Sequence, residues 1–86
     1  MAQLPPDGRW LVQQVDGTVM LFERDTEYEI ARWNAGDQNS IGPALKLIAE
    51  APELDLEQKS MATFWAGYFY AHARTGGPTY SVVIEP

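Results

Sequence analysis

The sequence predicts an α+β fold, in which a three- to four-stranded antiparallel meander packs against two helices and carries extended terminal arms. Three observations lead to this class. Three β-rich runs lie within residues 9–33, two helical segments lie at 40–51 and 55–75, and a last β-rich run occupies 79–86. A chain of 86 residues is expected to form a single domain over 1–86.

The first β-rich runs, RWLVQQV and TVMLFE, are separated by Asp16-Gly17. An Asp-Gly pair between two such runs is a strong hairpin signal. The third run, EYEIARW from Glu27 to Trp33, alternates in a way that indicates a half-buried strand. Residues 9–33 are therefore predicted to form the meander, and Pro5 and Pro6 make residues 1–8 an extended N-terminal arm.

Two helices are expected after the loop NAGDQNS. The first covers 40–51, with Ser40 as its N-cap and Pro52 beyond its end. The second covers 55–75, because Asp55 and the later Gln58 make a capping box and Gly76 suits the position after the helix. The closing run TYSVVIEP, within 79–86, is either a strand of this sheet or an arm that extends onto a neighbour.

The second helix contains the stretch MATFWAGYFYAHA, residues 61–73, which has no charged side chain. On a helix its large side chains form one stripe and its small ones lie on the other side. We expect the aromatic stripe to pack on the sheet and the alanine and glycine side to meet a second subunit or a larger partner. The candidate protein-interface residues, on this helix and on the terminal arms, are Leu4, Trp65, Tyr68, Phe69, Tyr70, Tyr80, Val82 and Ile84.

Composition excludes several classes of function. The net charge is −6, from twelve acidic and six basic residues, so the basic footprint of a nucleic-acid-binding protein is missing. The absence of cysteine excludes disulfides, zinc ribbons and thiol chemistry. The N-terminus does not read as a signal peptide, and the uncharged stretch is shorter than the roughly 18–20 residues that span a bilayer. We therefore expect partners to be neither nucleic acid nor membrane.

Candidate chemistry is sparse. His72 is the single histidine, and Ser60 and Ser81 lack a nucleophile motif. Glu27 and Glu29 would share a face of one strand, where two carboxylates serve acid–base chemistry or metal binding, or are simply solvated. We favour the solvated alternative. The sequence thus predicts no catalytic residues, no metal site, no cofactor and no small-molecule substrate, so the protein is not expected to be an enzyme.

The segment DGTVMLFERDTEYEIARW, followed by the helix FWAGYFYAHA, resembles the small, acidic, cysteine-free proteins of actinobacteriophages. The resemblance spans roughly residues 9–74. That group includes minor capsid and decoration proteins, and also small cytoplasmic proteins that act on host targets. The resemblance implies a bacteriophage context, with a place in the virion or in the bacterial cytoplasm. It matches no functional motif, so no site residue is carried over from it.

Three functional hypotheses follow, and the third depends on which side chains the fold brings together. The first is a structural or assembly protein that contacts copies of itself or a major capsid-type protein. The second is a small acidic regulator that binds and inhibits a host protein; its carboxylates would come from Glu23, Asp25, Glu27, Glu29, Glu50, Glu53, Asp55 and Glu57. The third, an enzyme, requires Glu27 or Glu29 to lie near His72.

Overall fold

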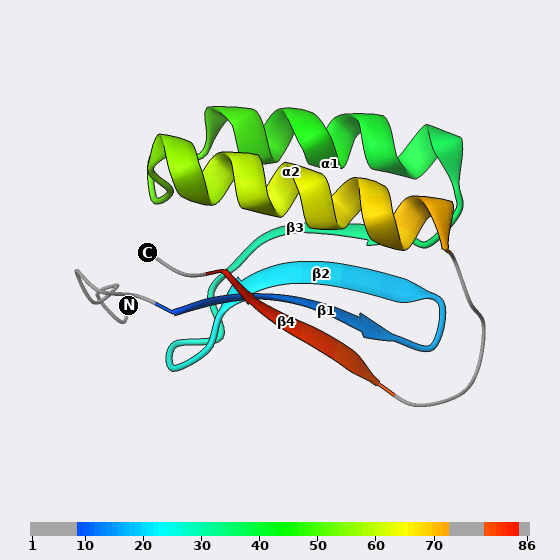
Figure 1. The fold of residues 1–86 in the computed structure, drawn as a ribbon, viewed down its shortest axis with the longest axis horizontal. Coiled ribbons are helices and arrows are strands. Elements are labelled where there is room, and N and C mark those ends of the chain that lie inside the picture. The colour runs from blue at the N-terminus through cyan, green and yellow to red at the C-terminus, as the bar shows by residue number, and fades with distance from the viewer. Residues whose placement is uncertain (1–8, 73–78, 85–86) are drawn as a thin grey trace.

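The computed structural model describes residues 9–72 and 79–84, and its two helices cover one face of an antiparallel sheet (Figure 1). The elements are β1 (Trp10–Val15), β2 (Thr18–Glu23), β3 (Glu29–Asn34), α1 (Gln38–Glu50), α2 (Leu56–Ala71) and β4 (Tyr80–Ile84). The strand order is β3-β2-β1-β4, and all neighbours are antiparallel. The predicted α+β class is confirmed, and the last run is a strand that pairs with β1 of its own chain.

The first hairpin has the predicted two-residue turn. Val15 lies opposite Thr18, so Asp16 and Gly17 alone connect β1 to β2. Asp16 has a positive φ of 57°, which aspartate tolerates better than most residues. The Asp-Gly pair therefore fixes the register of the two central strands, and this register directs Val12, Val19 and Leu21 into the core.

The third strand differs from its prediction at its start. Strand β3 begins at Glu29, not at Glu27, because Glu27 has a φ of 60° and lies in the preceding loop. The register with β2 then shifts: Leu21 lies opposite Ala31 but Phe22 lies opposite Glu29, so Ile30 is the extra residue of a bulge. The expected pair of carboxylates on one strand face is consequently not formed.

The loop between β2 and β3 is organised by one buried carboxylate. Glu23 has no exposed surface and accepts hydrogen bonds from the backbone N–H of Arg9 (3.1 Å), Asp25 (3.0 Å) and Thr26 (2.9 Å). The Thr26 hydroxyl donates a fourth bond, at 3.0 Å. Burial by itself raises the pKa of Glu23, but these hydrogen bonds together outweigh it and hold the pKa below its ordinary value of 4.5.

Glu23→Gln should therefore destabilise the fold at neutral pH by about 1–3 kcal/mol, because an amide lacks the charge and one acceptor that these donors need. The lowered pKa of Glu23 makes its contribution fully present above the ordinary value of 4.5 and lost as pH falls through the lower folded-state value. Urea unfolding followed at pH 7 and at pH 3 checks this: the gap between wild type and variant should narrow at pH 3. An equal gap at both pH values would show that the charge is not what holds the loop.

The helix ends agree only in part with their predictions. Helix α1 begins at Gln38 and is capped by Asp37, whose side chain accepts from the Asn39 N–H at 3.0 Å. Ser40 is not the cap: its hydroxyl accepts from the Asn34 N–H at 2.9 Å and ties β3 to α1. The capping box of α2, between Asp55 and Gln58, is confirmed, with distances of 2.8 and 3.0 Å.

Helix α2 is turned the other way from its prediction. Ala62 and Ala66 have no exposed surface, whereas Phe64 and Tyr68 of the aromatic stripe are exposed. Of that stripe only Phe69 is fully in the core, and Met61 and Trp65 are half-buried against it. The helix-facing side of the sheet already carries Trp10 and Trp33, so small side chains on α2 are what let the two layers approach closely.

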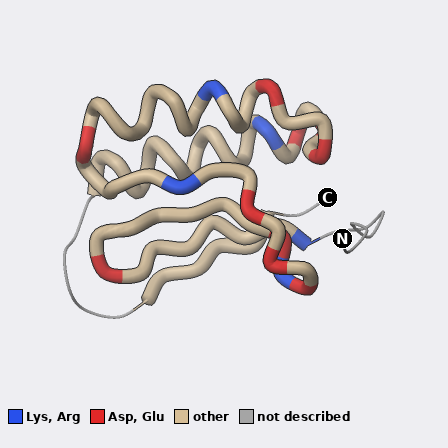
Figure 2. The backbone as a smooth tube through the Cα atoms, turned by 180° about the vertical axis from the view of Figure 1, so that it is seen from behind, with Lys and Arg blue, Asp and Glu red and all other residues tan. Residues whose placement is uncertain are grey.

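The later part of α2 and strand β4 contain no charged residue. The described acidic residues lie at turns and at the ends of elements (Figure 2). Between residues 60 and 84 the sequence holds a single charged residue, Arg74. The later part of α2 and the whole of β4 therefore form an uncharged region in a protein whose net charge is −6.

Candidate protein-interaction surface

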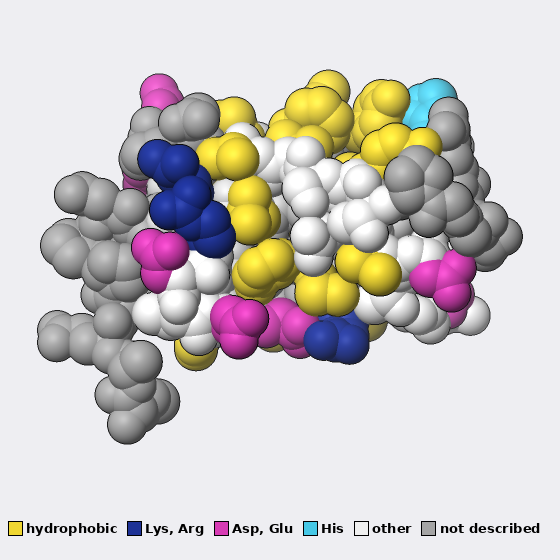
Figure 3. All heavy atoms as spheres, turned by 90° about the horizontal axis from the view of Figure 1, so that it is seen from below, with side chains coloured by type: hydrophobic (Ala, Val, Ile, Leu, Met, Phe, Trp, Pro, Cys, Tyr) yellow, Lys and Arg dark blue, Asp and Glu magenta, His cyan; other side chains and the backbone are white. Residues whose placement is uncertain are grey.

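The most conspicuous surface feature is a row of rings along α2, which we call the aromatic face and define as Phe64, Trp65, Tyr68 and His72. Phe64 is 62% exposed and Tyr68 is 46% exposed, while Trp65 is half-buried and His72 is exposed. Large aromatic side chains are costly to leave in water, because each carries about 150–250 Å² of mostly apolar surface. In Figure 3, hydrophobic side chains and the histidine project beyond one edge of the molecule.

The rings of the aromatic face touch one another in sequence. Phe64 and Trp65 have centroids 5.1 Å apart with an interplanar angle of 85°, and Trp65 and Tyr68 are 5.2 Å apart at 70°. Tyr68 and His72 continue the row at 4.6 Å with a tilt of 38°. Edge-to-face contacts of this kind fix the side-chain rotamers. The aromatic face is thus a preorganised surface, and ordering it on contact costs little entropy.

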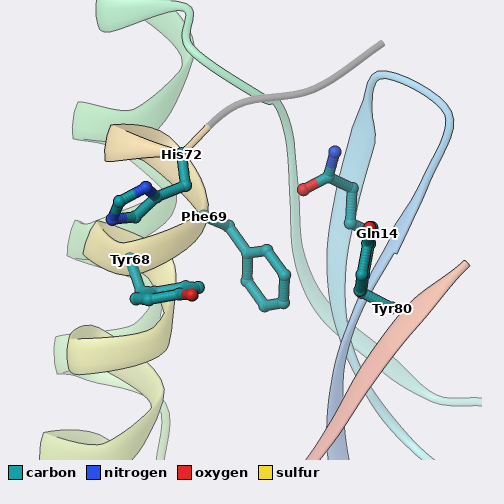
Figure 4. Close-up of a pocket in the computed structure, with 5 residues that line it drawn as sticks. All are labelled: Gln14, Tyr68, Phe69, His72 and Tyr80. Atoms are coloured by element: carbon teal, nitrogen blue, oxygen red, sulfur yellow. The ribbon is translucent and has the colours of Figure 1, made fainter. Parts of the chain in front are cut away.

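A small pocket lies where the aromatic face meets the sheet. Its volume is about 70 Å³, and Gln14, Tyr68, Phe69, His72 and Tyr80 line it. In Figure 4, Phe69 points from α2 toward the sheet, whereas Tyr68 and His72 lie on another side of the helix. Tyr80 belongs to the edge strand β4, so the pocket joins the aromatic face to that edge.

The predicted interface residues differ in how far the structure buries them. Tyr68 and Tyr80 are exposed, and Trp65, Tyr70 and Val82 are half-buried. Phe69 and Ile84 are core residues, 5% and 0% exposed, and this corrects their assignment to a contact surface. Leu4 and the arm over 1–8 lie outside the described residues, and α2, predicted to run to residue 75, ends at Ala71 with His72 as its C-cap. Phe64, the most exposed of the described aromatic side chains, was not in the predicted set and was expected to pack on the sheet with the rest of the stripe.

Many carboxylates already have structural roles. Asp37 and Asp55 cap the two helices, and Glu23 is buried in its loop. Glu29 forms an ion pair with Arg32 at 2.9 Å, which raises the pKa of Arg32, and Asp25 pairs with Arg24 at 3.2 Å. Glu53 accepts from the Tyr28 hydroxyl at 3.0 Å and thereby raises the pKa of that phenol.

The structure separates Glu29 from His72, a pair named in the enzyme hypothesis. Glu29 lies on β3 and His72 lies beside β4, at opposite edges of the sheet. Three strand spacings separate these edges, about 14 Å. Within residues 9–72 and 79–84, no three histidine or acidic side chains are grouped so that they could hold a metal ion. In the same part of the chain, no helix has the length and apolar character needed to cross a membrane.

The sheet face opposite the helices is a second, more mixed surface. It carries Leu11, Met20 and Phe22, all half-buried by their neighbours, and the exposed Val83. In Figure 3, which looks onto this face, polar and charged side chains are interspersed with the hydrophobic ones. Gln13 adds a cross-strand hydrogen bond to the Ser81 hydroxyl at 3.0 Å.

The aromatic face, the uncharged β4 edge and the mixed sheet face are the surfaces on which a role for this chain can be built. None of them comes with a role carried over from another protein. The chain matches no protein-family model, no curated protein and no solved structure.

Proposed function

We propose that the protein is a non-enzymatic assembly protein, which associates with further copies of itself through the aromatic face of α2. The observation that carries this proposal is the exposure of Phe64 and Tyr68 in a row of rings, on the part of α2 that follows Lys59 and holds no charged residue. Exposed apolar patches that are contiguous and preorganised are typical of protein contact surfaces. A structural role in a bacteriophage particle, as a minor capsid or decoration component, is the context that the sequence resemblance favours.

The alternative, an acidic regulator that binds a basic host protein, draws less support from the structure. Such a protein needs many free carboxylates on one face. Here Glu23, Asp37 and Asp55 stabilise the fold, and Asp25 and Glu29 are paired with arginines. The aromatic face is uncharged, which suits apolar contact better than electrostatic mimicry.

The double variant Phe64→Lys/Tyr68→Lys tests the proposal. Wild type should sediment as a defined oligomer whose mass is the same in low and high salt, because apolar contacts are not screened. The variant should sediment as a folded monomer, because two lysines cannot be desolvated against an apolar partner surface. Sedimentation velocity over a concentration series, with circular dichroism as a folding check, gives both results.

A matched control keeps the number and type of charges constant. Tyr28 and Leu47 are both exposed and line a common hollow beside α1, away from the aromatic face. Tyr28→Lys/Leu47→Lys should therefore leave the oligomer intact. A wild-type chain that remains monomeric at every concentration, or an oligomer that survives the aromatic substitutions, would refute the proposed function.

A further inference from the structure

The edge strand β4 differs from the opposite edge strand β3 in how it is protected. Unpaired edges invite pairing with another chain, and proteins usually block them with charges, prolines or bulges. Strand β3 has two of these three protections: Glu29 and Arg32 are charged, and its pairing with β2 contains a bulge. Strand β4, with the sequence YSVVI, has no charge and no proline, and its register with β1 is regular.

The aromatic face lies on the same side as the edge of β4, which pairs with β1 alone within residues 9–72 and 79–84. Helix α2 contacts β4, β1 and β2, whereas α1 contacts β3 at the far side of the sheet. Tyr68 and His72 line one pocket together with Tyr80 of β4. In the ribbon, β4 and α2 both lie toward the viewer, in front of β3 and α1 (Figure 1).

From these observations we infer that the occupant of the edge is β4 of a second copy, paired antiparallel across a two-fold axis into a continuous eight-stranded sheet. The inference rests on the proposed function and specifies its geometry. Full overlap of the two five-residue strands places Val82 on the axis, Tyr80 opposite the partner's Ile84 and Ser81 opposite the partner's Val83. In this register the same strand surface is used on both copies, as a two-fold interface requires.

The spacing of the layers suits this pairing. Strands lie about 4.8 Å apart, and α2 lies over β1, since it contacts β4, β1 and β2. Two such helices would run about 14 Å apart on the same face of the joined sheet. Helices in direct contact are about 8–10 Å apart, and a few ångströms more leave room for aromatic side chains between them. The two aromatic faces would thus fill the gap over the axis.

The exposed apolar area and the low local charge both favour a second copy of the chain as the occupant of the edge. Phe64, Tyr68 and Tyr80, exposed by 62%, 46% and 38%, offer on the order of 300 Å² per copy. Two copies supply about half of the roughly 1,200 Å² at which stable interfaces begin, and the paired strands add to this. Each chain carries a net charge of −6, yet residues 60–84 contain only Arg74 as a charged residue, so the two edges approach without like-charge repulsion.

A charge-swap experiment tests the pairing. Ser81 and Val83 are exposed on the open face of β4, so Ser81→Lys/Val83→Lys should fold and yet place lysines opposite lysines across the axis. We expect dimerisation about tenfold or more weaker for this variant and for Ser81→Glu/Val83→Glu. An equimolar mixture of the two should form a heterodimer as tight as wild type. Sedimentation velocity with one variant fluorescently labelled measures each case.

Asn34→Lys is the matched control at the other edge. Together with Arg32, the new lysine gives β3 two positive charges, as Ser81→Lys/Val83→Lys gives β4. This variant should leave the dimer unchanged. If the β4 variants dimerise like wild type, or if mixing restores nothing, the edge-pairing inference is overturned while association through the aromatic face still stands. A monomeric wild type overturns both, so the two failures are distinguishable.

Discussion

Trp33→Ala should lower the free energy of unfolding by about 3–5 kcal/mol, the range for deleting a large buried ring. Trp33 is 1% exposed on β3, within the core cluster. A chain of 86 residues has a total stability of only about 4–13 kcal/mol, so this loss is a large fraction of the total. Urea denaturation followed by circular dichroism measures the loss.

Two further variants show whether the loss of stability comes from the burial of the ring or only from the removal of an aromatic side chain. Trp33→Phe keeps most of the ring and removes an indole N–H that has no hydrogen-bond partner among the described residues, so it should cost clearly less. Phe64→Ala removes a ring that is largely exposed and should change stability by no more than about 0.5 kcal/mol. Equal losses for Trp33→Ala and Phe64→Ala would contradict the assignment of core and surface.

Ala62→Leu/Ala66→Leu should destabilise the monomer by about 2–6 kcal/mol, because each added isopropyl group must enter space that is already filled. Both alanines have no exposed surface and lie four residues apart, one turn above the other on the buried side of α2. The helix would have to lift from the sheet to admit them. Thermal unfolding by circular dichroism or calorimetry reports the loss.

The control moves the same substitutions one position along the helix. Thr63 and Gly67 are also four apart but exposed, and a side chain at Gly67 would meet nothing within 4 Å. Thr63→Leu/Gly67→Leu should be neutral or stabilising, because leucine is a better helix former than threonine or glycine. If both pairs were tolerated alike, the rings and not the alanines would face the sheet, as the sequence suggested.

The strands and turns could be predicted because their signals are local. Asp16-Gly17 specified the first hairpin, and the pair Asp55 and Gln58 specified the start of α2. The start of β3 could not be predicted, because Glu27 in a left-handed conformation and the bulge at Ile30 depend on the hydrogen bonds that the buried Glu23 accepts around the loop. The same loop shows how a carboxylate that looks solvated in sequence becomes part of the core.

The orientation of α2 was predicted wrongly for a physical reason. In its later part the helix carries apolar residues on every side, so its periodicity does not indicate which side faces inward. Residue size suggested that the rings belong inside. The decisive information lies in the sheet, where Trp10 and Trp33 leave room for alanines but not for a second layer of rings. The candidate surface therefore became visible only after the layers were assembled.

Hydroxyl-radical footprinting over a dilution series, read out by mass spectrometry, tests the central claim about α2 most directly. In dilute solution Phe64 and Tyr68 should be labelled readily while Phe69 is protected. In concentrated solution Phe64 and Tyr68 should become protected, whereas the exposed Tyr28 and Leu47 remain labelled. Protection of Phe64 and Tyr68 at every concentration would mean that the rings face the sheet, and labelling at every concentration would mean that they do not mediate assembly.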